Sequence, residues 1–154
     1  MKALIQRVTK AEVLVGGKPT GVIGLGLLAL LGVEVGDTAK EADWLAEKLV
    51  TLRIFSDAES HLNLSLLDVE GSILLVSQFT LLGDCRKGRR PSFSRAAHPK
   101  LAEELYRYLG QRLSDSVPVS YGQFGAHMSI NLVNDGPVTF MLEKSPESPP
   151  TEKP

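Results

Sequence analysis

The side chains that most often carry catalysis are few and widely separated in this sequence. The three histidines are His61, His98 and His127, and they form neither an H-x-H nor an H-E-x-x-H spacing. Cys85 is the only cysteine. The glycine patterns that cradle nucleotide phosphates or open a dinucleotide-binding helix do not occur either. Because a metal site needs several such ligands in a cluster, we expect neither a protein-bound metal nor another cofactor.

The segment 77–81, with the sequence SQFTL, places polar groups at the end of an apolar run. In a continued strand, Gln78 and Thr80 would share one face, and Ser77 and Phe79 would share the other. A buried glutamine amide needs hydrogen-bond partners, because leaving such a group unsatisfied costs about 1–3 kcal/mol. The segment is therefore either a functional site or a strand that ends in a polar loop.

The segment 86–95, with the sequence RKGRRPSFSR, contains five basic residues. It can be a solvated loop, or it can hold a phosphate backbone, because arginine presents forked donors to phosphate oxygens. The same charges could activate the thiol of Cys85. No histidine lies near this cysteine in the sequence, which favours an ordinary loop thiol.

The segment 132–140, with the sequence LVNDGPVTF, combines a flexible glycine with a rigid proline. Residues 134–136 are typical of a hairpin turn. Pro137 would then stand where the next strand begins, and its missing N–H costs little if that strand lies at a sheet edge. The pattern predicts two strands joined by a turn.

These segments must be positioned by a mixture of strands and helices. Residues 27–33, with the sequence LLALLGV, form an apolar run typical of a strand buried on both faces, and residues 72–81 predict another strand. Thr38 and Glu41 form a capping box that predicts the start of one helix, and Pro99 indicates the first turn of a second. About seven strands and two helices in mixed order predict an α+β fold.

The composition indicates one ordinary globular domain. The chain has 154 residues, 43% of them hydrophobic and 23% charged, and its net charge of −1 argues against coating nucleic acid through bulk charge. A single cysteine favours a reducing compartment, and no signal peptide or membrane span is visible. We expect a cytoplasmic protein that binds no membrane, with a domain at residues 1–143 and a disordered, proline-rich tail at residues 144–154.

Together, these segments resemble the D-aminoacyl-tRNA deacylases, also described as D-tyrosyl-tRNA(Tyr) deacylases. The resemblance runs from Met1 to about Glu143, and its two signature motifs are SQFTL and NDGPVT, present in order. Further matching stretches are LIQRV at 4–8, RIFSD at 53–57 and RPSFS at 90–94. Either motif alone would be weak, whereas both together are specific.

The resemblance implies a homodimer with its active sites at the subunit interface. It implies hydrolysis of the ester between a D-amino acid and the terminal adenosine of tRNA, and also of glycine mischarged on tRNA(Ala). The implied fold is a barrel-like, curled and mixed β-sheet with two helices alongside. A cis bond between Gly136 and Pro137 is implied too, in a motif that reaches into the partner's pocket, grips the α-ammonium and rejects L side chains, with Arg7 as its brace.

The same resemblance implies how the reaction proceeds without a strong acid or base. The aminoacyl ester is already activated and has a neighbouring 2′-hydroxyl. Ser77, Gln78, Phe79 and Thr80 form the implied catalytic group, with backbone N–H groups near Phe79 and Thr80 as oxyanion donors. Thr80 is either a nucleophile or, because it has no evident base, a positioning residue. Phe124 and Met128 are the implied walls for adenine.

Three other functions remain open from the sequence. The chain can be a non-catalytic RNA-binding module for charged tRNA ends, which would keep the basic segment without hydrolysing anything. It can be a structural dimer, for which the apolar strands suffice. It can also be a hydrolase of free amino-acid esters or amides, and comparing tRNA-linked with free esters separates that activity from the deacylase.

Overall fold

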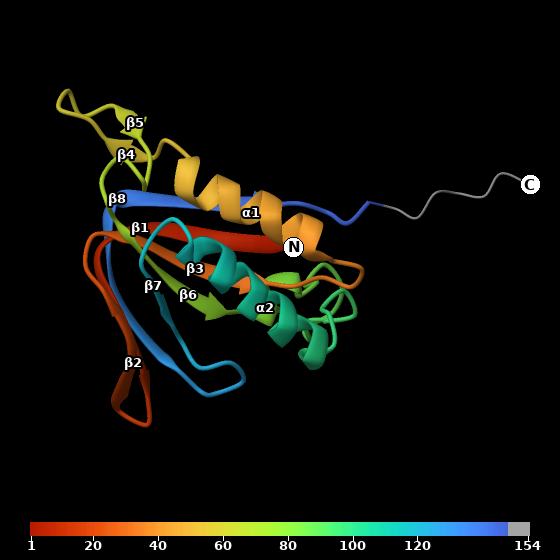
Figure 1. Ribbon diagram of the computed structural model, residues 1–154. Coiled ribbons are helices and arrows are strands. Elements are labelled where there is room, and N and C mark those ends of the chain that lie inside the picture. The colour runs from red at the N-terminus through yellow and green to blue at the C-terminus, as the bar shows by residue number, and fades with distance from the viewer. Residues whose placement is uncertain (148–154) are drawn as a thin grey trace, which may run out of the picture.

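The computed structural model describes residues 1–147. A curled sheet forms the body, and the helices α1 and α2 lie beside each other along one side of it (Figure 1). The elements in chain order are β1 (Lys2–Val15), β2 (Lys18–Ile23), β3 (Gly26–Gly32), α1 (Ala39–Thr51), β4 (Phe55–Ser56), β5 (Leu62–Leu64), β6 (Ser72–Ser77), the 3₁₀-helix η1 (Phe79–Leu82), α2 (Pro99–Ser114), β7 (Val119–Tyr121) and β8 (Ser129–Glu143). The predicted α+β fold with a barrel-like mixed sheet is confirmed.

The long strand β1 organises the sheet. One edge of β1 pairs with β2 and β3, and the other pairs antiparallel with β8. β3 also pairs parallel with β6, and β6 in turn pairs parallel with β7. The sheet curls until β7 approaches β2, where the Ser120 hydroxyl donates to the Val22 carbonyl at 3.1 Å. Within the part of the chain that the structure describes, β8 pairs only with β1, so its outer edge is open.

Two apolar clusters explain why β3 is apolar throughout. Leu27, Ala29 and Leu31 face the larger cluster, which the two helices cover. Leu28 faces a smaller cluster inside the curl of the sheet. A strand buried on both faces needs apolar residues at every position, so the strand predicted from the run 27–33 is confirmed as β3.

Both helices begin where the sequence predicts. The Thr38 N–H donates to Glu41 Oε2 at 2.7 Å, and the Lys40 N–H donates to Thr38 Oγ1 at 3.2 Å. The backbone N–H of Glu41 also donates to the Thr38 side chain, and this bond together with the one from the Thr38 N–H to Glu41 forms the predicted capping box. α2 begins at Pro99, whose missing N–H would have had no acceptor in the first turn.

The predicted hairpin turn at residues 134–136 is wrong. β8 runs through the segment as one strand, and the Gly136–Pro137 peptide bond is cis. Thr139 pairs with Gln6 and Asn134 pairs with Val8, so residues 135–138 bulge out opposite the single residue Arg7. The turn propensity of Asn-Asp-Gly therefore produces a bulge, because pairing on both sides keeps the chain on β1.

The predicted strand at residues 72–81 is too long. β6 ends at Ser77, and Phe79 opens the 3₁₀-helix η1. The alternation expected for Gln78 and Thr80 therefore does not apply. A tight turn replaces the strand at the point where polar residues replace apolar ones.

The domain boundary at residue 143 stays a prediction. β8 ends at Glu143, and the Lys144 N–H still donates to the Met1 carbonyl at 3.0 Å. The other part of the expected tail, residues 148–154, lies outside the described residues. Across residues 1–147, no helix has the length and apolar character needed to cross a membrane.

Candidate active site

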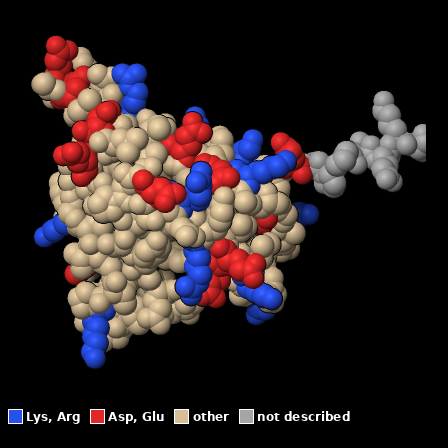
Figure 2. All heavy atoms as spheres, in the orientation of Figure 1, with Lys and Arg blue, Asp and Glu red and all other residues tan. Residues whose placement is uncertain are grey.

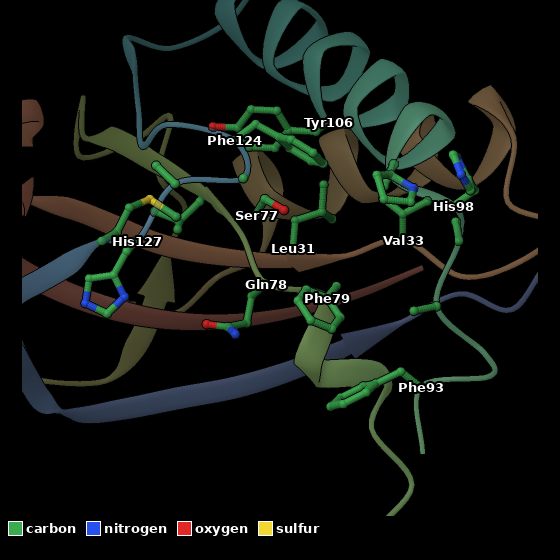
Figure 3. Close-up of a pocket in the computed structure, with 18 of the residues that line it drawn as sticks. Leu31, Val33, Ser77, Gln78, Phe79, Phe93, His98, Tyr106, Phe124 and His127 are labelled. Atoms are coloured by element: carbon green, nitrogen blue, oxygen red, sulfur yellow. The ribbon is translucent and has the colours of Figure 1, made fainter. Parts of the chain in front are cut away.

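A cavity of about 650 Å³ opens at the end of β6, between the sheet and the start of α2 (Figure 3). This volume lies within the range usual for small-molecule sites. Four groups of residues line it: the ends of β3 and β6 with Phe79, residues 93–98 before α2, the first half of α2, and the segment 124–130. The cavity therefore forms where segments distant in sequence meet, beside the SQFTL motif.

The turn that follows β6 presents two free backbone donors. The Gln78 N–H donates to the Leu31 carbonyl at 2.6 Å, which fixes the start of the turn to β3. Phe79 and Thr80 are the first residues of η1, and their N–H groups have no acceptor among residues 1–147. The first N–H groups of a helix lack intrahelical acceptors. Adjacent free donors beside a cavity are suited to an oxyanion.

The polar side chains of the turn bind each other. The Gln78 amide donates to the Thr80 hydroxyl, and Ser77 and Gln78 line the cavity. Within the described residues, no carboxylate or imidazole is hydrogen-bonded to the Thr80 hydroxyl. Thr80 therefore has an orienting partner but no base, which is the wrong environment for a strong nucleophile.

The opposite wall of the cavity is aromatic and apolar. The rings of Tyr106 and Phe124 lie 5.7 Å apart between centroids (Figure 3). Both rings line the cavity, together with Met128. The Tyr106 hydroxyl donates to the Leu75 carbonyl at 2.9 Å. Burial raises the pKa of Tyr106, so the phenol stays neutral. This wall offers a flat apolar surface for an aromatic ring.

The Gly136–Pro137 bulge lies away from this cavity in the same chain. Arg7 is buried, and its Nε contacts both the carbonyl oxygen of Asp135 at 3.2 Å and the carboxylate of Asp135 at 3.1 Å. Its Nη1 donates to the Ile54 carbonyl at 3.0 Å and to the Ser56 hydroxyl at 3.2 Å. Arg7 thus ties the bulge to the chain segment that follows α1.

Gly136 is constrained as well as exposed. Its φ of +129° is a conformation that other L-residues rarely adopt, and an added Cβ would lie 2.7 Å from Val138 Cγ2 and 3.3 Å from Arg7 Nη2. Pro137 is exposed beside it. The bulge therefore presents backbone at the surface, held from beneath by a buried guanidinium.

The structure brings together most, but not all, of the residues singled out from the sequence. Five of the nine line the cavity: Ser77, Gln78, Phe79, Phe124 and Met128. Thr80 is bonded to Gln78 at its rim. The remaining three, Arg7, Gly136 and Pro137, form the separate bulge.

Sequence reasoning missed several residues at these two places. Phe93, His98 and His127 line the cavity, and Ser56 binds Arg7. The RPSFS and RIFSD stretches hinted at Phe93 and Ser56, but only the folded chain shows what they contact. No three metal-ligating side chains gather anywhere in the range 1–147.

The charges on the visible face are mixed in sign (Figure 2). Acidic side chains gather on and near the projecting β4–β5 hairpin, where Asp57 and Glu59 lie (Figures 1 and 2). Such an acidic projection repels phosphates. A nucleic acid that reaches the cavity should therefore approach from another side.

Comparison with known proteins gives consistent matches. A family model described as D-Tyr-tRNA(Tyr) deacylase matches residues 4–143. A D-aminoacyl-tRNA deacylase from Geotalea uraniireducens (strain Rf4) is 59% identical over 144 residues, which cover 93% of each chain. A D-aminoacyl-tRNA deacylase from Geobacter sulfurreducens (strain ATCC 51573 / DSM 12127 / PCA) is 54% identical over 152 residues, covering 98% of this chain and all of the relative.

Solved structures share the fold over nearly the whole chain. One described as c-Myc DNA Unwinding Element Binding Protein has a TM-score of 0.89 and 40% identity, and the match covers 94% of this chain and 99% of that one. Another, described as a probable eukaryotic D-amino acid tRNA deacylase, has a TM-score of 0.79 at 20% identity, covering 92% and 97%. This second likeness concerns the fold alone.

Proposed function

The chain belongs to the D-Tyr-tRNA(Tyr) deacylase family, and from this membership we propose that it hydrolyses the ester bond of D-aminoacyl-tRNA. The products are a free D-amino acid and tRNA, so the reaction removes mischarged tRNA before translation. One observation carries the proposal: the intact SQFTL motif forms a turn with two free N–H donors at the rim of a cavity.

The backbone donors of the turn stabilise the transition state. Attack on the ester carbonyl places negative charge on its oxygen, and the N–H groups of Phe79 and Thr80 donate hydrogen bonds to that oxygen. Losing one such donor typically lowers the rate about 10²–10³-fold. Water is the nucleophile, assisted by the 2′-hydroxyl of the terminal ribose. The ester bond breaks and the ribose oxygen leaves with a proton.

The side chains of the turn position the substrate. The Thr80 hydroxyl, held by the Gln78 amide, orients the ester, and Ser77 orients the terminal ribose. The lack of a base bonded to Thr80 within residues 1–147 supports this role over nucleophilic attack. Phe124 and Met128 enclose the adenine ring on the aromatic wall of the cavity.

A second copy of the chain completes the site. β8 offers an open edge and three exposed apolar side chains, Val133, Phe140 and Met141, which a partner would cover. The Gly136–Pro137 bulge does not line the cavity of its own chain. We assign it to the cavity of the partner, in a homodimer whose two sites lie at the interface.

The bulge then acts as the chiral filter. Backbone carbonyls of Gly136 and Pro137 bind the α-ammonium of the substrate, which fixes the α-carbon. A D side chain points out of the pocket, whereas an L side chain would collide with backbone. Glycine has no side chain to reject, so glycyl-tRNA(Ala) is also a substrate. Arg7 keeps the bulge rigid through Asp135.

A second candidate is a non-catalytic module that binds nucleic acid. The 40% identical structure described as c-Myc DNA Unwinding Element Binding Protein favours such a role. Deacylation of D-tyrosyl-tRNA by the purified protein separates the two candidates. Release faster than spontaneous hydrolysis supports the deacylase, and binding of charged tRNA without release supports the module.

A further inference from the structure

Two exposed aromatic side chains form a ledge at the rim of the cavity. Phe79 and Phe93 stand nearly edge to face, with ring centroids 5.1 Å apart and an interplanar angle of 66°. Their exposed fractions are 53% and 39%, although both line the cavity (Figure 3). In Figure 3, Phe79 lies next to Gln78 and Phe93 lies beyond Phe79, both on the opposite side of the cavity from Phe124. The proposed catalytic role uses only the backbone N–H of Phe79 and gives no role to the two exposed rings.

The ledge is fixed in place by the two ends of the basic segment. Asp84 and Ser92 exchange backbone hydrogen bonds at 2.8 and 2.9 Å, which close the segment into a loop. The Ala97 N–H donates to the Val33 carbonyl at 3.0 Å, which ties its far end to the sheet. A Cβ on Gly83 would lie 3.1 Å from the Phe93 ring, so the ring packs directly on the backbone after η1.

Within residues 1–147, two of the five basic side chains of the loop bind carboxylates, and three do not. Arg86 binds the Asp84 carboxylate, with Nε 2.9 Å from Oδ1, and Arg95 binds Glu34 at 2.7 Å. In the described part of the chain, no carboxylate pairs with the other three cations, Lys87, Arg89 and Arg90, all of which are exposed. The loop therefore carries its unpaired positive charge between the paired residues Asp84 and Ser92, and the ledge residue Phe93 directly follows Ser92.

We infer that this ledge binds the base of the nucleotide that precedes the terminal adenosine, while the free cations bind the adjoining phosphates. Exposed aromatic rings beside unpaired basic side chains are the surface that single-stranded nucleic acid requires, since bases stack on the rings and the cations follow the backbone. The inference rests on the proposed function, because it takes the adenosine at the Phe124 wall as its starting point.

The geometry favours this occupant over the amino-acid side chain. A single-stranded end needs both stacking and charge neutralisation, and the loop supplies the two together. Amino-acid side chains would use the rings but would gain nothing from three free cations. Phe93 is thus assigned as a residue that favours substrates with a nucleotide before the terminal adenosine over substrates with adenosine alone.

The test compares two small substrates, the D-tyrosyl ester of adenosine and the D-tyrosyl ester of the dinucleotide cytidylyl-adenosine. The parent is expected to show a higher kcat/KM for the dinucleotide ester. Phe93→Leu keeps an apolar side chain but removes the stacking surface. It should reduce this preference about 5- to 20-fold, which is the lower range expected for one stacked base. The control Phe124→Leu should lower both values by the same factor.

Three results would overturn the inference. The first is equal hydrolysis of both esters by the parent. The second is a Phe93→Leu protein that hydrolyses both more slowly by one factor, which would reduce Phe93 to a brace for Phe79. The third is a Phe93→Leu protein whose preference between the D-tyrosyl and D-alanyl esters of adenosine has changed, which would mean that the ledge binds the amino-acid side chain. If the parent hydrolyses neither these esters nor D-tyrosyl-tRNA, the proposed function fails instead. Binding of a non-hydrolysable amide analogue of the dinucleotide ester, compared between parent and Phe93→Leu, still tests the ledge.

Discussion

The buried guanidinium of Arg7 holds Asp135 by both its backbone and its side chain, at 3.2 and 3.1 Å. Asp135 directly precedes Gly136, so this contact fixes the start of the bulge. The same guanidinium also binds Ile54 and Ser56 from a distant part of the chain. The rigidity of the proposed filter therefore depends on one side chain that bridges two segments.

Arg7→Lys should weaken the chiral filter. A lysine ammonium is a compact point charge and lacks the planar fork that reaches Asp135, Ile54 and Ser56 at once. We expect kcat/KM for D-tyrosyl-tRNA to fall about 10- to 100-fold, and the ratio of D to L hydrolysis to fall with it. Ser56→Ala removes only one contact and is the matched control, with a loss of about 5-fold or less. An Arg7→Lys protein with the parental D/L ratio would contradict the bracing role.

Gly136→Ala should remove D-aminoacyl-tRNA deacylation while leaving the fold largely intact. The φ of +129° and the contact with Val138 both oppose a Cβ, so the backbone that we propose to hold the α-ammonium must shift. We expect a loss of about 100-fold or more, since a misplacement of about 1 Å can cost that much. Gly17→Ala is the control, because Gly17 also has a positive φ (+78°) but has open space around its Cβ. Equal losses in the two variants would mean that strain alone is responsible.

Mixed dimers test whether the bulge serves the partner's cavity. Gly136→Ala has a defective bulge, and a Gln78→Ala/Thr80→Ala variant has a defective cavity. If each site combines one cavity with the other subunit's bulge, one site of each mixed dimer carries both intact parts. Random mixing at equal amounts should therefore restore about one quarter of the parental activity. No recovery after verified subunit exchange would place cavity and bulge in the same chain.

The pKa of Asp84 reports how the basic loop is anchored. Hydrogen bonds from the Arg86 side chain, followed by its backbone N–H, lower this pKa below the usual 3.8. A lowered pKa in the folded state stabilises the fold above pH 3.8, and this contribution is lost as the pH falls toward the folded value. Arg86→Ala should raise the pKa toward 3.8, as measured by NMR titration of the carboxyl carbon. Arg107→Ala, which breaks a different surface pair, should leave it unchanged.

Local signals in the sequence predicted the elements that local interactions determine. The capping box at Thr38 and Glu41 lies within one turn of chain, and the apolar run of β3 reflects burial on both faces. The hairpin at residues 134–136 failed because pairing with β1 on both sides overrides turn propensity. Strand alternation likewise failed at Gln78, where the chain turns into η1.

In the candidate site, too, the sequence indicated local features but not contacts between distant residues. The SQFTL motif singled out the segment beside the cavity, because its polar residues directly follow an apolar strand, but the turn itself was predicted as part of that strand. The contacts of Phe93 with Phe79 and of Ser56 with Arg7 join residues far apart in sequence. No local pattern encodes such contacts, since they depend on how the loops pack after the sheet has formed.

The most direct test of the central claim is deacylation of D-tyrosyl-tRNA, L-tyrosyl-tRNA and glycyl-tRNA(Ala) by the purified protein under identical conditions. The account predicts rapid release from the D-tyrosyl and glycyl substrates and no release from the L-tyrosyl substrate above the spontaneous rate. Equal hydrolysis of the D and L substrates would contradict the filter at Gly136 and Pro137. No hydrolysis of any of them would contradict the deacylase itself.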